Sequence, residues 1–221
     1  MSSVRAVIYD FDGLLLETEG PTYQSWAETY EAHGVPLSLD EWTLTIGRVD
    51  HPDPWEELQR RLGRPLDPSV RDARRQRRDE LLHALGPCAG AAESLLEARE
   101  LGLATAVASS SGADWVGSHL DRLGLGAYID HLSCYDGTIP AKPAPDLYLR
   151  ALRQLGVDAG AAVAFEDSHN GLRAAKAAGI RCVVVPTPMT ARMDFSLADL
   201  VIDRLGRPPL RELLVQLTGA A

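Results

Sequence analysis

The first residues able to do chemistry are Asp10 and Asp12, which follow the short apolar run of residues 4–9. Such a run, rich in Val and Ile, is typical of a buried strand. The carboxyl ends of the strands form the ligand crevice of an open α/β sheet, so both acids are expected at its floor. Two carboxylates 4 Å apart repel by about 4 kcal/mol at an effective dielectric of about 20. A cation or a shared proton would offset this repulsion, and Mg²⁺, which prefers oxygen ligands, suits the pair.

Gly13 allows the chain to turn beyond the strand. This turn would let Asp10 attack a substrate while Asp12 exchanges protons from a different position. Taken alone, the same residues also suit a strand end that is capped by solvated acids.

Three further polar groups are expected at the same edge, where later strands end: Ser109 with Ser110, Lys142, and Glu166 with Asp167. A serine turn that opens a helix offers hydroxyl and free N–H groups to a phosphate. A lysine could neutralise both a phosphoryl group and a carboxylate, and the acidic pair supplies the acids that a metal would still need. Each group alone also suits a helix cap or a solvated surface. Their joint occurrence favours one shared ligand.

The elements that must position these residues alternate in type along the chain. Apolar strands are expected at residues 103–108, 132–134, 161–165, 181–185 and 200–202, with helices between them. This order predicts an α/β fold with a parallel sheet covered by helices on both faces. Residues 17–87 show no strand pattern and are predicted to form a helical insertion, whose first helix would be capped by Thr18. Residues 1–16 and 88–221 would then form the core.

The composition of the 221 residues is that of an ordinary globular protein, with 45% apolar and 24% charged residues. The formal net charge of −9 argues against a nucleic-acid surface, which needs a basic face. Three cysteines without metal-type spacing indicate reduced thiols. Neither a leader-like segment nor a run of 18 apolar residues occurs, so we expect a cytoplasmic protein without a membrane partner.

This set of motifs resembles the haloacid dehalogenase superfamily of phosphatases and phosphotransferases, in its branch with β-phosphoglucomutase and small sugar-phosphate phosphatases. The match lies in Asp10-Phe-Asp12-Gly13, Ser109 after a buried strand, Lys142-Pro-Ala-Pro-Asp146 and Phe165-Glu166-Asp167-Ser168. The resemblance implies a Rossmann-like core and an α-helical cap inserted after the first motif. It implies a Mg²⁺-dependent phosphomonoester hydrolase for a small metabolite such as a sugar, polyol or nucleotide phosphate.

The resemblance also implies a role for each motif residue. Asp10 would be the nucleophile that forms an aspartyl-phosphate and a metal ligand. Asp12 would protonate the leaving oxygen and then activate water, with its backbone carbonyl on Mg²⁺. Ser109, Ser110 and Lys142 would hold the phosphoryl oxygens. Asp167 would be a metal ligand, with Glu166 as a further ligand or as a group beside the ligands.

Two other functions stay open at this point: a sugar phosphomutase that uses the same aspartyl-phosphate, and a non-catalytic protein that binds a phosphorylated ligand. The mutase has a histidine where this chain has Thr22, which favours the hydrolase. Arg48, in the helical insertion, is a candidate for substrate specificity. We expect a monomer or a weak homodimer.

Overall fold

The computed structural model describes residues 4–43, 46 and 53–219. The chain divides into two compact units. One runs to Leu16 and resumes at Pro87, and the other is Glu17–Gly86. No helix in the described ranges is long and apolar enough to cross a membrane.

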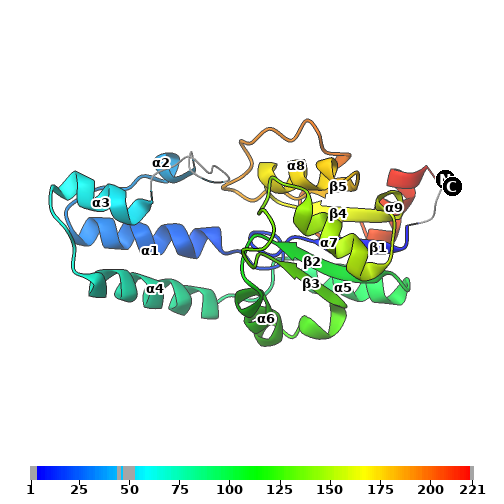
Figure 1. Cartoon of the computed structure of the whole chain (residues 1–221), viewed down its shortest axis with the longest axis horizontal. Coiled ribbons are helices and arrows are strands. Elements are labelled where there is room, and N and C mark those ends of the chain that lie inside the picture. Colours follow the sequence, from blue (N-terminus) through cyan, green and yellow to red (C-terminus); the bar gives the residue numbers. More distant parts are fainter. Residues whose placement is uncertain (1–3, 44–45, 47–52, 220–221) are drawn as a thin grey trace. The chain divides into compact units, whose positions relative to one another are not determined.

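The first unit is built on a parallel sheet of six strands in its described residues, in the order β3-β2-β1-β4-β5-β6 (Figure 1). The expected α/β, Rossmann-like fold class is confirmed. The strands are β1 (Ala6–Tyr9), β2 (Ala104–Ser109), β3 (His131–Cys134), β4 (Ala162–Glu166), β5 (Arg181–Val184) and β6 (Leu200–Val201).

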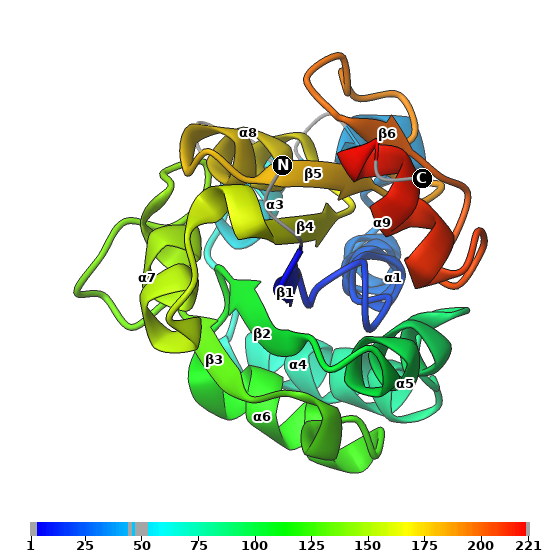
Figure 2. The same cartoon turned by 90° about the vertical axis from the view of Figure 1, so that its right-hand side faces the viewer.

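Helices cover both faces of this sheet (Figure 2). They are α5 (Ala91–Glu100), α6 (Ala113–Arg122), α7 (Asp146–Leu155), α8 (His169–Ala177) and α9 (Leu210–Thr218), with the 3₁₀ turns η1 (Gly126–Tyr128) and η2 (Ala159–Ala161). On the face toward α7 and α8 the strands carry many buried alanines. Such small side chains allow helices to pack close to the strands, which brings side chains of α7 and α8 near the strand ends.

The strand register decides which residues meet at the carboxyl edge. Tyr9, the last residue of β1, pairs with Val107 of β2 and Phe165 of β4. Its ring stacks on Phe165 with the ring centres 5.1 Å apart, which anchors β1 against β4. Because parallel strands end at the same edge, the residues directly beyond these three must be neighbours. Asp10 and Glu166 directly follow Tyr9 and Phe165, and Ser109 lies two residues after Val107, so polar groups gather at this edge.

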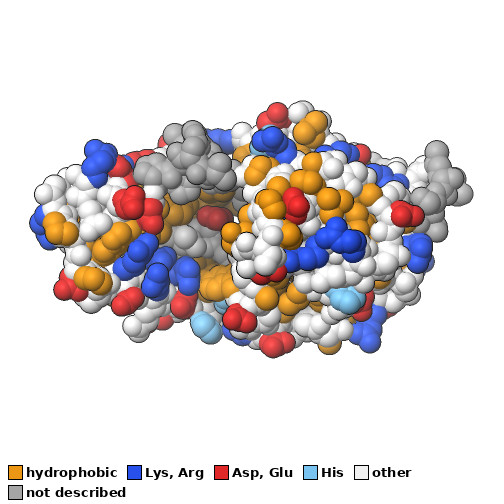
Figure 3. Space-filling view, viewed as in Figure 1, with side chains coloured by type: hydrophobic (Ala, Val, Ile, Leu, Met, Phe, Trp, Pro, Cys, Tyr) orange, Lys and Arg blue, Asp and Glu red, His pale blue; other side chains and the backbone are white. Residues whose placement is uncertain are grey.

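The second unit is helical, as expected, and contains α1 (Glu19–Ala32), α2 (Leu39–Thr43), α3 (Pro54–Leu62) and α4 (Pro68–His83). Asp53 and Asp67 cap α3 and α4, and each stands before a proline at the first helical position. Arg77 of α4 forms an ion pair with Glu28 of α1 at 2.8 Å. Acidic and basic side chains are accordingly mixed on the visible surface of this unit (Figure 3).

The prediction that the Thr18 side chain caps the first helix of this unit is wrong. Thr18 occupies the capping position of α1, but its hydroxyl makes no capping hydrogen bond. The Glu17 carboxylate instead accepts the Gly20 backbone N–H at 2.8 Å. The side chains of Thr18 and Glu17 can each supply an oxygen to a free N–H group at the start of a helix. The backbone angles of Thr18 lie in the helical region, which turns its hydroxyl away from these N–H groups.

Candidate active site

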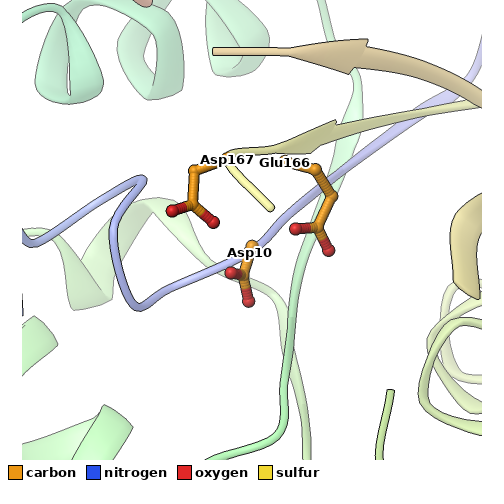
Figure 4. Close-up of side chains that lie close together, drawn as sticks. All are labelled: Asp10, Glu166 and Asp167. Carbon is orange, nitrogen blue, oxygen red and sulfur yellow. The ribbon is translucent and has the colours of Figure 1, made fainter. Parts of the chain in front are cut away.

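Three acidic side chains meet at the carboxyl edge of the sheet: Asp10, Glu166 and Asp167. Asp10 follows β1 directly, and its backbone N–H donates to the Phe165 carbonyl at 2.9 Å. One carboxylate oxygen of each acid lies within 4.8 Å of those of the other two. Figure 4 shows the three side chains side by side, with Asp167 and Glu166 on either side of Asp10. All three side chains are buried, so solvent screens their mutual repulsion poorly.

Lys142 is the cation of this cluster. Its Nζ donates to Asp10 Oδ1 and to Glu166 Oε1, each at 2.6 Å. Burial by itself would lower the pKa of this lysine, but attraction to both carboxylates outweighs burial and raises the pKa above its ordinary value. The ammonium group is therefore charged at neutral pH and is available to an anionic substrate.

The donor set fits a divalent metal ion such as Mg²⁺. Three carboxyl groups face a single ammonium group in a buried space, so the acids outnumber the cation. Burial, followed by repulsion from Glu166, accordingly raises the pKa of Asp10 to about 7. Oxygen ligands with uncompensated negative charge are those that a hard cation prefers.

Tyr148 completes the surroundings of Glu166. Its hydroxyl donates to Glu166 Oε1, the same oxygen that accepts from Lys142. Burial and the adjacent carboxylate raise the pKa of Tyr148 well above its ordinary value, so this hydroxyl stays a donor. Tyr148 was not predicted from the sequence, and the available signal was a tyrosine on the otherwise aliphatic face of the helix at residues 147–155.

Two glycines lie directly against the acidic pair. A Cβ added at Gly13, whose φ is +87°, would lie 2.2 Å from Asp167 Oδ2. A Cβ added at Gly171, in α8, would lie 1.9–2.2 Å from the Glu166 carboxylate atoms. The loop at Gly13 and helix α8 can approach these two carboxylates so closely because glycine has no side chain.

Gly171→Ala is expected to destabilise the protein by about 1–3 kcal/mol, although alanine in a helix interior usually stabilises by up to about 1 kcal/mol. The reason is that Glu166 is completely buried and cannot move aside without leaving Lys142. Gly117→Ala, in α6, is the matched control, since nothing lies within 4 Å of its added Cβ. Urea unfolding of both variants checks this, and equal stabilisation by both would contradict it.

Asp12 is held by a different set of groups from Asp10. Its Oδ2 accepts from Ser111 Oγ, in the turn after β2, at 2.6 Å and from Ser109 Oγ, at the end of β2, at 3.3 Å. Its Oδ1 accepts from Trp115 Nε1, in α6, at 3.1 Å. The two acids of the first motif therefore face different partners, one a cation and the other neutral donors.

The comparisons with known proteins agree with this geometry. The sequence model of the haloacid dehalogenase-like hydrolase family matches residues 4–179 of this chain. The chain belongs to this hydrolase family. YhcW of Bacillus subtilis (strain 168), which carries a provisional phosphatase name, is 36% identical over 217 residues, covering 98% of this chain and 99% of that protein. Hexitol phosphatase B of Escherichia coli (strain K12) is 33% identical over 217 residues, covering 96% of this chain and 97% of that protein.

A solved structure adds a ligand to these comparisons. A CbbY variant from Rhodobacter sphaeroides, in complex with xylulose-(1,5)bisphosphate, is 29% identical with a TM-score of 0.71 and covers 91% of this chain and 94% of its own. The superfamily recognised from the four motifs is thus confirmed. The family and the phosphatase names of its members also support the predicted enzyme class, a phosphoric monoester hydrolase.

For this haloacid dehalogenase-like hydrolase, the structure brings most of the predicted site residues together. Ser109 contacts Asp12, whereas the Ser110 hydroxyl accepts the Lys142 backbone N–H at 3.3 Å. The side chain of Asp12 is not in the acidic cluster, and a metal contact through its backbone carbonyl stays a prediction. Arg48 lies outside the described residues.

Two partners of Asp12 were also not predicted from the sequence. Ser111 was part of the predicted serine turn, and its place two residues after Ser109 was the signal that could have identified it. Trp115 had no such signal, because an aromatic residue near a helix start is usually packing. Its role depends on how α6 lies against the end of β1.

Proposed function

We propose that this chain is a Mg²⁺-dependent phosphatase that hydrolyses a small sugar or polyol phosphate through an aspartyl-phosphate on Asp10. The observation that carries this proposal is the buried Asp10 carboxylate, bonded at 2.6 Å to Lys142 among two further acids. A carboxylate nucleophile divides one difficult displacement into two easier steps. The surrounding charges suit the remaining task, which is to position the phosphoryl group and neutralise it.

In the first step an Asp10 oxygen attacks phosphorus, and the bond from phosphorus to the ester oxygen breaks. The electron pair of that bond goes to the leaving oxygen, which takes a proton from Asp12. Lys142 neutralises charge on the phosphoryl oxygens, and the hydroxyls of Ser109 and Ser110 bind them. Asp12 is suited to the proton transfer because its carboxylate accepts hydrogen bonds from neutral hydroxyls, whereas the Asp10 carboxylate accepts one from the buried Lys142 ammonium group.

In the second step Asp12 takes a proton from water, which attacks phosphorus and releases phosphate and the free Asp10 carboxylate. Asp10 and Asp167, with Glu166 and the Asp12 carbonyl, would hold the Mg²⁺ ion. When bound, Mg²⁺ supplies positive charge that offsets the repulsion between the Asp10 carboxylate and the anionic substrate. The proton returned to Asp12 prepares it for the next substrate.

We propose that the unit Glu17–Gly86 is the cap that sets the substrate, with Arg48 as one specificity residue. Support for sugar and polyol phosphates over nucleotides comes from the relatives, one named a hexitol phosphatase and another solved with xylulose-(1,5)bisphosphate. The negative net charge of −9 agrees with a small metabolite as partner rather than a nucleic acid.

A phosphate-release screen tests this function. Sugar, polyol and nucleotide monophosphates are supplied with Mg²⁺ and, separately, with EDTA. We expect release from sugar or polyol phosphates that depends on Mg²⁺ and is absent in Asp10→Asn. Conversion of a hexose 1-phosphate to the 6-phosphate without free phosphate would show a mutase instead. Binding of phosphate esters without turnover would show a binding protein.

Mg²⁺ is expected to raise the thermal stability of the protein, and EDTA is expected to reverse the rise. An ion at 100 times its Kd stabilises the folded state by about 2.7 kcal/mol. Asp167→Asn is expected to reduce the effect, because it removes one of three buried carboxylates from the cluster. Differential scanning calorimetry measures the shift. An unchanged Tm across millimolar Mg²⁺ would contradict the proposed metal site.

A further inference from the structure

The Asp12 carboxylate is fixed at both of its oxygens by groups of different chemistry. Two serine hydroxyls, from Ser111 and Ser109, contact Oδ2 at 2.6 and 3.3 Å. The indole Nε1 of Trp115 contacts Oδ1 at 3.1 Å. A hydroxyl can donate or accept, whereas an indole N–H can only donate. The two oxygens of Asp12 are therefore not equivalent.

The indole is itself anchored to the first motif. Its ring meets the His119 ring edge to face, with centres 4.4 Å apart, one turn further along α6. His119 is buried and stacks on Phe11, with ring centres 6.3 Å apart. Phe11 stands between the two acids of the motif and is completely buried. Helix α6 thus contacts Phe11, the residue before Asp12, through His119. It contacts the Asp12 carboxylate itself through Trp115.

We propose that Trp115 is a positioning residue for Asp12, which selects the carboxylate oxygen that carries the transferred proton. This inference rests on the phosphatase function proposed above. A protonated carboxyl group has one good acceptor, its carbonyl oxygen, and one O–H donor. The indole N–H keeps Oδ1 as the acceptor. The proton then belongs on Oδ2, beside Ser109, one of the two serines proposed to bind the phosphoryl group.

This arrangement matters in the step that forms the aspartyl-phosphate. The bond from Asp10 to phosphorus forms, the bond to the ester oxygen breaks, and the leaving oxygen receives the proton from Asp12 Oδ2. An alkoxide is a poor leaving group and needs this proton. A p-nitrophenolate ion carries the electron pair without it. The contribution of Trp115 should therefore depend on the leaving group.

Trp115→Phe tests the proposal, because it keeps a ring against His119 and removes the N–H. The measurement is kcat/KM with Mg²⁺ for sorbitol 6-phosphate and for p-nitrophenyl phosphate, since this constant reports the step that breaks the ester bond. We expect a loss of about 10- to 100-fold for sorbitol 6-phosphate and less than about threefold for p-nitrophenyl phosphate. Asp12→Asn should show the same selectivity with a larger loss.

Equal losses on both substrates would assign Trp115 a structural role and overturn the proposal, and so would no loss on either. Trp115→Leu gives the same comparison if the phenylalanine variant does not fold. Tyr128→Phe, in η1 of the same unit as Trp115, is the control for an aromatic exchange away from the site. An unmodified protein that releases phosphate from none of the esters in the screen above would refute the phosphatase function itself, which is a different result from any loss confined to Trp115→Phe.

Discussion

Asp10→Asn is expected to lower kcat for phosphate release by about 10⁴-fold or more, because an amide cannot replace the carboxylate as nucleophile. The exchange preserves the shape of the side chain. Glu166 still pairs with Lys142 at 2.6 Å, so the variant should fold. It should also retain the phosphorylated ligand, since the serines and Lys142 are unchanged.

The measurement for Asp10→Asn combines phosphate release with mass spectrometry of the quenched enzyme. A phosphorylated species should form in the unmodified protein and be absent in the variant. Asp203→Asn, an exposed acid of the same unit, is the matched control and should keep full activity. Full turnover by Asp10→Asn would end the proposed mechanism.

Lys142→Met is expected to lower both stability and activity. It leaves the buried Asp10 and Glu166 carboxylates without their cation, and loss of one partner of a buried ion pair costs about 3–5 kcal/mol. Activity should fall by about 10²- to 10³-fold, because a positive charge directed at the phosphoryl group is lost. Lys176→Met is the control, since this lysine pairs with Asp199 in a partly exposed position.

The stability deficit of Lys142→Met should depend on pH in a defined direction. In the unmodified protein the folded state raises the pKa of Asp10 to about 7, above its ordinary value of 3.8. Between these values the folded state binds more protons than the unfolded state, so this group's contribution to stability decreases as pH rises. Lys142 lowers the pKa of Asp10, so removing Lys142 raises this pKa further. The pH range over which the contribution of Asp10 decreases then extends to higher pH.

In EDTA, therefore, the difference in unfolding free energy between Lys142→Met and the unmodified protein should be larger at pH 8 than at pH 5. Urea titrations at the two pH values measure it. Added Mg²⁺ should recover part of the loss by replacing the missing positive charge. A deficit that is independent of pH, or as small as that of Lys176→Met, would contradict the assigned role of Lys142.

The sequence by itself determined the sheet and the polar residues at its edge. Apolar runs that end in Asp10, Ser109 and Glu166 specify strands, and alternation with helices specifies a parallel sheet. Parallel strands end at one edge, so these side chains had to meet wherever the helices lay. That is why the acid pair, the lysine and the serines could be selected before their distances were known.

Only the tertiary structure decided how each carboxylate is held. Tyr148 and Trp115 reach Glu166 and Asp12 because α7 and α6 lie at particular heights and rotations against the strands. Those positions follow from side-chain packing across many residues, such as His119 against Phe11, and leave no local pattern in the chain. The donors that distinguish one acid from the other were therefore not predictable from spacing, whereas the acids themselves were.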